Sequence, residues 1–179
     1  MHAMQTDTVI FTALGRLLEY PAEDFQESLE EALHCARETS PCVAECIEAF
    51  WADAARLSAE NARELYTRSF DLAPVCVPYV SVHVFGAESF KRAELMTGLK
   101  AAYERAGCDC GSELPDHIAS VLQLGPRLEP EEWADLSTLV IAPAADKMHA
   151  ALEGANSPWR HVMRAVRKAF EVGDATHGE

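Results

Sequence analysis

The sequence predicts an all-α fold, a helical bundle that forms a single domain. Apolar side chains recur every three to four residues through most of the chain, which is the spacing of one helix face. Proline, glycine and serine fall between these periodic segments, where helices typically begin and end. A length of 179 residues suits one domain. We therefore expect one domain over residues 1–172 and a flexible tail over residues 173–179.

Four helices are predicted in the first 70 residues. Pro21 ends the first, and the acidic residues after it suit the positive N-terminal end of the second. Ser40 can cap the third helix, with Pro41 in its first turn, and Ser58 can cap the fourth. The expected helices cover residues 9–20, 22–37, 41–57 and 59–70.

Residues 71–78 are predicted to be a break, marked by prolines at positions 74 and 78. In the next segment Val80, Val82 and Val84 alternate with other residues, and this local pattern is typical of a β-strand. The family resemblance described below implies a short buried helix here. We favour the helix, because a lone strand would have no partner elsewhere in the chain to satisfy its backbone hydrogen bonds.

Residues 89–106 predict a strongly amphipathic helix. Its expected apolar face consists of Phe90, Ala93, Met96, Leu99, Ala102 and Tyr103. Gly107 can end this helix, because glycine readily takes the left-handed conformation found at helix C-termini. Pro115 suits the first turn of a short helix that reaches about Leu124, and the two residues after Pro115 would share that turn.

The last third of the chain predicts three further helices. Pro143 ends the first of them, and Gly154 ends the second. Ser157 and Pro158 begin the last, which has an apolar face and basic residues largely outside it. The expected bounds are residues 131–142, 144–153 and 157–172.

The formal charge of −14 bears on possible partners. Twelve acidic and three basic residues among the first 60 give that part a charge of −9. Phosphate backbones and anionic membrane surfaces would be repelled, so nucleic acid is not an expected partner. A basic peptide would be attracted. The simpler interpretation is that the charge keeps the protein soluble.

The chain has no apolar run of the roughly 18–20 residues that a membrane helix needs, so stable membrane insertion is not expected. The first residues lack the basic and apolar blocks of a secretion signal. We therefore expect a cytoplasmic monomer with its six cysteines reduced. Cys42 and Cys46 share a helix face, and Cys108 and Cys110 flank an acidic residue, but neither pair has zinc-site spacing.

The most distinctive segment is Glu113-Leu114-Pro115-Asp116-His117, which brings a carboxylate, an imidazole and a rigid proline together. It is preceded by a spaced set of residues that comprises Tyr66, Phe70, Asp71, His83, Gly86, Met96, Tyr103 and Gly107. With this combination, residues 60–125 resemble the maturation chaperones of molybdoenzymes, specifically the nitrate reductase delta-subunit (NarJ-type) proteins related to TorD and DmsD. The pattern departs after the motif, where Ile118-Ala119 and Gln123-Leu124 replace the usual Leu-Pro and Glu-Phe.

The resemblance implies an all-helical bundle of the TorD/NarJ-like type that binds a client and catalyses no reaction. The client would be the apo catalytic subunit of a molybdoenzyme. Its N-terminal segment, a twin-arginine signal or the remnant of one, would be held until the molybdenum cofactor is inserted, before export or membrane docking. No cofactor of the chaperone's own is expected.

The resemblance also implies a client-binding groove between the motif and nearby helices. The expected binding residues are Glu113, Leu114, Pro115, Asp116, His117, Tyr66, Phe70, Tyr79 and His83. Asp116 would accept a hydrogen bond from an arginine or backbone N–H of the client. His117 would give a hydrogen bond that depends on protonation near neutral pH.

Other interpretations of the same residues remain. Asp116 can simply cap a helix, and aromatic residues at helical spacing are more often core than binding site. No phosphate-binding loop, nucleophile elbow or zinc-protease motif occurs, so no catalytic or metal-ligating residue is assigned. The alternative from another class is a small metal-binding protein or enzyme that uses His83, Asp116, His117 and the cysteines. A permanent structural subunit of a complex is a third.

Overall fold

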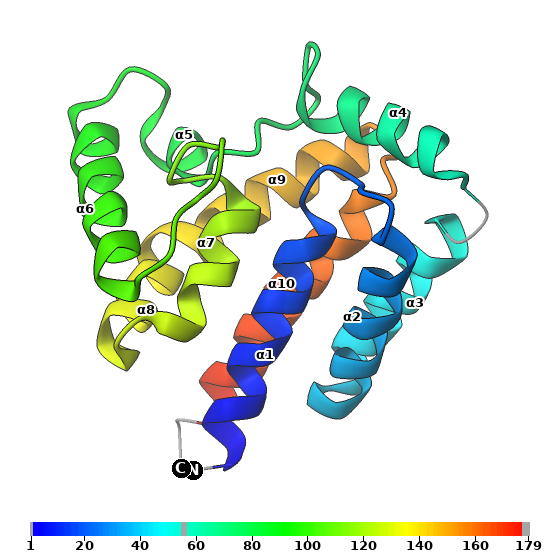
Figure 1. The fold of residues 1–179 in the computed structure, drawn as a ribbon, viewed down its shortest axis with the longest axis horizontal. Coiled ribbons are helices and arrows are strands. Elements are labelled where there is room, and N and C mark those ends of the chain that lie inside the picture. Colours follow the sequence, from blue (N-terminus) through cyan, green and yellow to red (C-terminus); the bar gives the residue numbers. More distant parts are fainter. Residues whose placement is uncertain (1, 55–56, 177–179) are drawn as a thin grey trace.

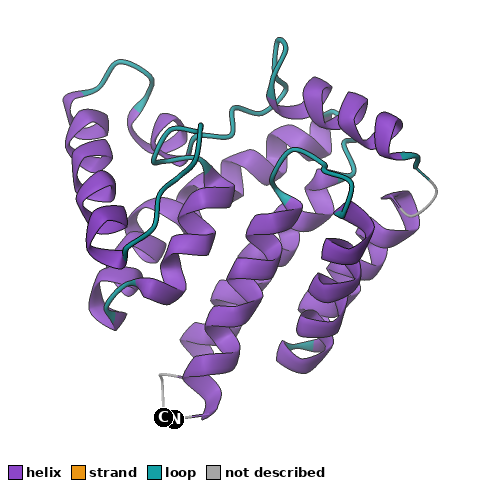
Figure 2. Cartoon of the chain, in the orientation of Figure 1, coloured by secondary structure: helices purple, strands orange, loops and turns teal. Residues whose placement is uncertain are grey.

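The computed structural model describes the backbone of residues 2–54 and 57–176, and the side chains of residues 9–54 and 57–172. The described backbone is almost entirely helices and connecting loops, with no β-strand (Figures 1 and 2). This confirms the predicted all-α fold. The elements are α1 His2–Leu17, α2 Phe25–Thr39, α3 Pro41–Ala54, α4 Ala59–Phe70, α5 Val80–Phe85, α6 Phe90–Ala106, α7 Ile118–Leu124, η1 Gly125–Arg127, α8 Pro130–Leu136, η2 Ser137–Ile141, α9 Ala142–Gly154 and α10 Trp159–Thr176.

Helices α1 and α10 form the centre of the bundle (Figure 1). Helices α2 and α3 pack on one side of this pair, and α7 and α9 pack on the other. The core between them is fully buried and consists largely of leucine, isoleucine, valine, alanine and aromatic side chains. None of the helices in the described part of the chain has both the length and the apolarity needed to cross a bilayer.

The C-terminal end of α1 is held by two aromatic donors. Tyr66 Oη donates to the carbonyl oxygen of Leu18 at 2.9 Å, and Trp159 Nε1 donates to that of Leu17 at 2.9 Å. The last carbonyls of a helix have no partner within the helix, so these bonds satisfy groups that would otherwise be buried and unpaired. They attach α4 and α10 to α1 and fix the start of the α1–α2 connection.

Several predicted boundaries are confirmed. Ser58 caps α4 by accepting a hydrogen bond from Asn61 N at 3.2 Å. Gly107 ends α6 in the left-handed conformation, with a φ of 65°. The segment after Tyr79 is the short helix α5 and not a strand. Helix α10 continues to Thr176, four residues into the expected tail, and residues 177–179 lie outside the described residues.

The predicted apolar face of α6 is wrong at its N-terminal end. Phe90 is 79% exposed, and only Leu99, Ala102 and Tyr103 are buried on this helix. Each step of three residues turns by about 300° around a helix, so a strict three-residue spacing drifts. After three such steps Leu99 lies about half a turn away from Phe90. Only the Leu99 side of α6, at one edge of the bundle in Figure 1, reaches the core.

The expected helix end at Pro143 is also wrong. The backbone stays helical from Pro130 to Gly154, with the π-helical turn η2 between α8 and α9. Pro143 is the second residue of α9, directly after η2. The wider π turn shifts the hydrogen-bond register at the point where proline cannot donate, so the chain continues without a break.

The helix after the motif begins later than predicted. Val80 N donates to the Asp116 carbonyl at 3.0 Å, and Ile118 N donates to the Pro78 carbonyl at 2.8 Å. These bonds make an isolated antiparallel bridge between Tyr79 and His117. Because the bridge holds the backbone in an extended conformation, α7 starts at Ile118 and not at Pro115.

Candidate functional site

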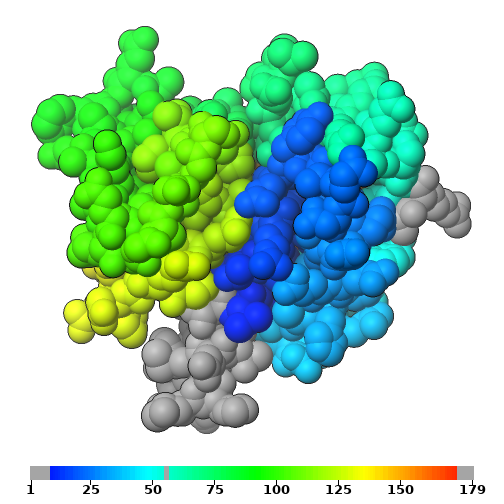
Figure 3. Space-filling view, in the orientation of Figure 1, coloured from blue at the N-terminus to red at the C-terminus, as the bar shows by residue number. Residues whose placement is uncertain are grey.

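A surface groove of about 400 Å³ lies beside the 113–117 turn. It is formed by the end of α1, the end of α4, the residues before α5, the loop before the turn and the start of α7. In Figure 3 the yellow-green surface around the turn lies beside the blue surface at the end of α1. The lining residues are Glu19, Tyr20, Tyr66, Phe70, Asp71, Pro78, Tyr79, Cys110, Gly111, Ser112, Glu113, His117, Ala119 and Ser120.

One wall of the groove is aromatic. The rings of Tyr20 and Tyr66 meet edge to face with centroids 5.6 Å apart, and Phe70 lies 4.9 Å from Tyr66. Among the other lining residues, the rings of Tyr79 and His117 meet edge to face at 5.8 Å. Aromatic side chains offer large rigid apolar surfaces, so this wall suits apolar side chains of a ligand.

The groove is acidic. Its lining includes the carboxylates of Glu19, Asp71 and Glu113, and no lysine or arginine occurs among the described lining residues. The Glu113 carboxylate lies at the surface, where it accepts a hydrogen bond from Tyr79 Oη at 3.3 Å. A cleft lined by one sign of charge attracts the opposite sign, so the groove favours a cationic ligand.

The 113–117 turn is divided between surface and interior. Glu113 and Leu114 are exposed and Pro115 is half-buried, whereas Asp116 and His117 are 0% and 4% exposed. The Tyr79–His117 bridge pulls the second half of the turn inward. Of the five motif residues, Glu113 and His117 line the groove.

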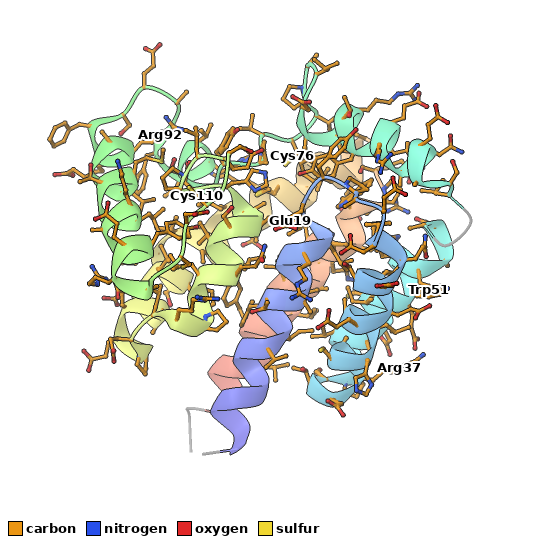
Figure 4. The ribbon with its side chains drawn as sticks, in the orientation of Figure 1. Glu19, Arg37, Trp51, Cys76, Arg92 and Cys110 are labelled. Atoms are coloured by element: carbon orange, nitrogen blue, oxygen red, sulfur yellow. The ribbon has the colours of Figure 1, made fainter. Side chains whose placement is uncertain are left out.

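Asp116 occupies a buried polar network. Ser81 donates its hydroxyl hydrogen to Asp116 Oδ2, and Arg92 Nη2 lies 3.8 Å from the same oxygen. Arg92 Nε also donates to Ser81 Oγ at 2.9 Å, and Figure 4 shows Arg92 between α6 and α5. The idea that Asp116 directly receives a client donor does not fit this position, because its carboxylate has no contact with solvent. Asp116 instead holds the turn in place through its contacts with Ser81 and Arg92.

His117 lines the groove and caps α7. Its Nδ1 accepts a hydrogen bond from Ala119 N at 3.2 Å, which satisfies one of the free N–H groups at the helix start. Burial lowers the pKa of His117 below its ordinary value, although Glu113, Asp116 and Glu19 act in the opposite direction. The imidazole is therefore neutral at neutral pH, and the predicted switching near pH 7 moves to lower pH.

The structure does not bring His83 into the groove. Its Nε2 lies 2.7 Å from the Val77 carbonyl oxygen, and its own carbonyl accepts a hydrogen bond from Lys147 at 2.6 Å. Tyr66 and Phe70 line the groove, although most of each side chain is buried. The three side chains of the metal-site alternative, His83, Asp116 and His117, thus have separate partners, and no metal-like cluster of His, Cys, Asp or Glu forms among the described residues.

Glu19 was not predicted and has the most central position. It lines the groove and two adjoining depressions of about 230 and 280 Å³, and Gln123 Nε2 donates to its carboxylate at 2.7 Å. Cys110 lines the groove and one of these depressions, and its thiol donates to the Glu113 carbonyl at 3.2 Å. Figure 4 labels Glu19 at the end of α1 and Cys110 in the loop near α7. In the sequence, the acidic and aromatic residues Glu19 and Tyr20 directly before Pro21 are the one local feature that could have indicated this part of the groove.

A family model described as "Nitrate reductase delta subunit" matches residues 13–165, most of the chain. The chain belongs to the nitrate reductase delta subunit family. It is 29% identical over 159 residues to the "Probable nitrate reductase molybdenum cofactor assembly chaperone NarW" of Escherichia coli K12. That match covers 88% of this chain and 66% of the relative, so the chain spans just under two thirds of the relative's length.

A solved structure supports the fold. The crystal structure of a putative redox enzyme maturation protein from Archaeoglobus fulgidus aligns with a TM-score of 0.62 over 94% of each chain, at 22% sequence identity. The resemblance inferred from the 113–117 motif is therefore confirmed at the level of family and fold. The relative's name is that of a chaperone and not of an enzyme, which agrees with the prediction of a non-catalytic protein.

Proposed function

We propose that this protein is an assembly chaperone for a molybdenum-containing oxidoreductase. Its groove would bind the N-terminal segment of the apo catalytic subunit, whether a twin-arginine signal or the remnant of one. Holding that segment would keep the apoprotein open for insertion of the molybdenum cofactor and delay export or membrane docking. Family membership supports the general role, and the acidic, aromatic groove supports the binding of a cationic, apolar segment.

The exposed apolar residues near the groove carry the proposal that the ligand is a polypeptide. Tyr20 lines the groove and is 55% exposed, and Leu114 belongs to the turn beside it. Leu72 and Val75, 74% and 45% exposed, lie on the loop that joins the lining residues Asp71 and Pro78. Clustered exposed apolar side chains mark interaction surfaces, and these extend beyond what a small molecule in the groove would cover.

The expected affinity is moderate. Burying roughly three or four apolar side chains of a client helix would contribute about 5–12 kcal/mol before costs. Ordering a flexible segment removes about 2–5 kcal/mol, and loss of translational freedom removes more. The net is a contact in about the micromolar range, near −8 kcal/mol. Such a contact is reversible, as release of the client requires.

The test is titration calorimetry with a synthetic peptide in which an arginine pair precedes an apolar helical segment. We expect binding that weakens as salt is added, because the groove carboxylates attract the arginines. Neutralising three groove carboxylates should weaken binding by about three- to 150-fold, since exposed ion pairs contribute about 0.2–1 kcal/mol each. The triple variant is Glu19→Gln, Asp71→Asn and Glu113→Gln.

The matched control neutralises carboxylates far from the groove, on α2 and α3, and should leave the affinity unchanged. The control variant is Glu30→Gln, Glu38→Gln and Glu45→Gln, none of which lines the groove or its adjoining depressions. If the peptide does not bind, or if both triple variants lose the same affinity, the groove is not the binding site.

A further inference from the structure

We propose that α6 positions the 113–117 turn for client binding, with Arg92 and Tyr103 as the positioning residues. The proposal rests on the proposed function of the groove and deepens it. Neither residue lines the groove. Each acts through a hydrogen bond to the part of the turn that lies behind the groove surface.

The first attachment is the network at Asp116. Arg92 is 22% exposed and reaches Asp116 both through Ser81 and by its own guanidinium, 3.8 Å from Oδ2. Asp116 Oδ1 accepts no hydrogen bond from the described residues. The negative charge of this fully buried carboxylate is therefore stabilised at Oδ2 alone. Ser81 contributes a hydrogen bond there, and Arg92 contributes the positive charge.

The second attachment is at the preceding residue. Tyr103 Oη donates to the Pro115 carbonyl oxygen at 3.2 Å. Burial raises the pKa of Tyr103 far above its ordinary value, so the hydroxyl stays protonated and remains a donor at physiological pH. Two consecutive residues of the turn, Pro115 and Asp116, are thus each bonded to α6 or to a side chain that α6 holds.

One face of α6 makes both attachments. Arg92 and Tyr103 are 11 residues apart, which is about three helical turns, so they point in nearly the same direction. Leu99 lies on the same side and is buried in the core. Phe90 is two residues before Arg92, about 200° away around the helix, which places it in solvent. The inner face of α6 is therefore narrow: Leu99 packs in the core, and Arg92 and Tyr103 contact the residues that hold the turn and the turn itself.

The position of the turn sets the chemistry of the groove. Glu113 and His117, on either side of Pro115 and Asp116, both line it. The backbone bridge at Tyr79 and His117 holds the C-terminal end of the turn, and the Tyr79 hydroxyl and the Cys110 thiol bond to Glu113 at its other end. Without the α6 bonds, Pro115 and Asp116 between these two ends would lose their restraint from α6, and binding would require this part of the turn to be ordered again.

The test uses the full chain and the fluorescein-labelled form of the arginine-pair peptide. Arg92→Leu and Tyr103→Phe should each bind about tenfold more weakly, as expected for loss of one positioning hydrogen bond. Tyr103→Phe keeps the ring and its packing, so a purely structural role would leave the affinity unchanged. Arg105→Leu is the matched control, because Arg105 is on the same helix and pairs with exposed Glu132 at 2.6 Å.

A double variant separates positioning from packing. Arg92 acts through Asp116, so adding Arg92→Leu to an Asp116→Asn variant should weaken binding much less than the roughly tenfold loss expected in the wild-type background. Amide hydrogen exchange of residues 113–118 should be faster in Arg92→Leu and in Tyr103→Phe, even without peptide. Unchanged exchange and unchanged affinity in both single variants would overturn the proposal, as would the full loss of affinity, about tenfold, when Arg92→Leu is added to Asp116→Asn. If the wild type does not bind the peptide, the proposed function fails, and the exchange rates still decide whether α6 positions the turn.

Discussion

The contact between Tyr66 and the end of α1 gives a sharp prediction. In Tyr66→Phe the ring and its aromatic neighbours stay, but the bond of 2.9 Å to the Leu18 carbonyl is lost. Both residues are buried, so water does not readily replace the donor. Leaving a buried acceptor unpaired costs about 1–3 kcal/mol.

The assay is thermal and urea unfolding. For a chain of this length each 1 kcal/mol lowers the melting temperature by about 2–4 °C, so we expect a decrease of about 2–12 °C. Tyr20→Phe is the matched control, because Tyr20 is the exposed ring that packs on Tyr66. Its hydroxyl loss should change stability by less than about 0.5 kcal/mol.

The reasoning would be refuted if Tyr66→Phe melted within experimental error of Tyr20→Phe. The same variant also tests the link between fold and groove. Leu18 is directly followed by Glu19 and Tyr20, which line the groove, so Tyr66→Phe should weaken peptide binding as well as stability.

Two further predictions concern acid and packing. The folded-state pKa of His117 is lowered by burial, so the unfolded chain binds a proton first as the pH falls, and stability decreases below about pH 6.5. His117→Asn keeps a capping acceptor and should flatten that part of a stability-against-pH curve, whereas an unchanged slope would assign the loss to His149 and His161, whose pKa values burial also lowers. Gly15→Ala would place a Cβ 2.8 Å from the Ala119 carbonyl oxygen, forcing α1 and α7 apart beside the groove. In urea unfolding we expect Gly15→Ala to lower the free energy of unfolding by about 1–3 kcal/mol, offset by up to about 1 kcal/mol from the higher helix propensity of alanine. Gly98→Ala is the control and should not destabilise the protein, because the space around its Cβ is open.

Local features of the chain were predicted well because their causes are local. The Ser58 cap and the Gly107 stop depend on hydrogen bonds and backbone angles within a few residues. The α5 helix was favoured because no second strand was available, which is a property of the whole sequence. Pro143 and the face of α6 were predicted wrongly, since a π turn and the drift of a three-residue spacing are not visible in residue types alone.

The candidate site was predicted in part. The motif resemblance placed Tyr66, Phe70, Tyr79, Glu113 and His117 around one groove, and the structure brings them together there. It could not show that Asp116 faces inward, because the partners that hold it come from α5 and α6 and are distant in sequence. It also could not show that His83 lies outside the groove, where its Nε2 is 2.7 Å from the Val77 carbonyl oxygen.

By itself the sequence determined the helices, the family and the motif that marks the site, because period, caps and breaks are fixed by neighbouring residues. Only the tertiary structure decided which motif residues line the groove and which do not. It also placed Glu19 at the centre of the site and Arg92 behind it. The physical reason is that burial and charge compensation depend on side chains from separate helices, and packing alone sets which of them meet.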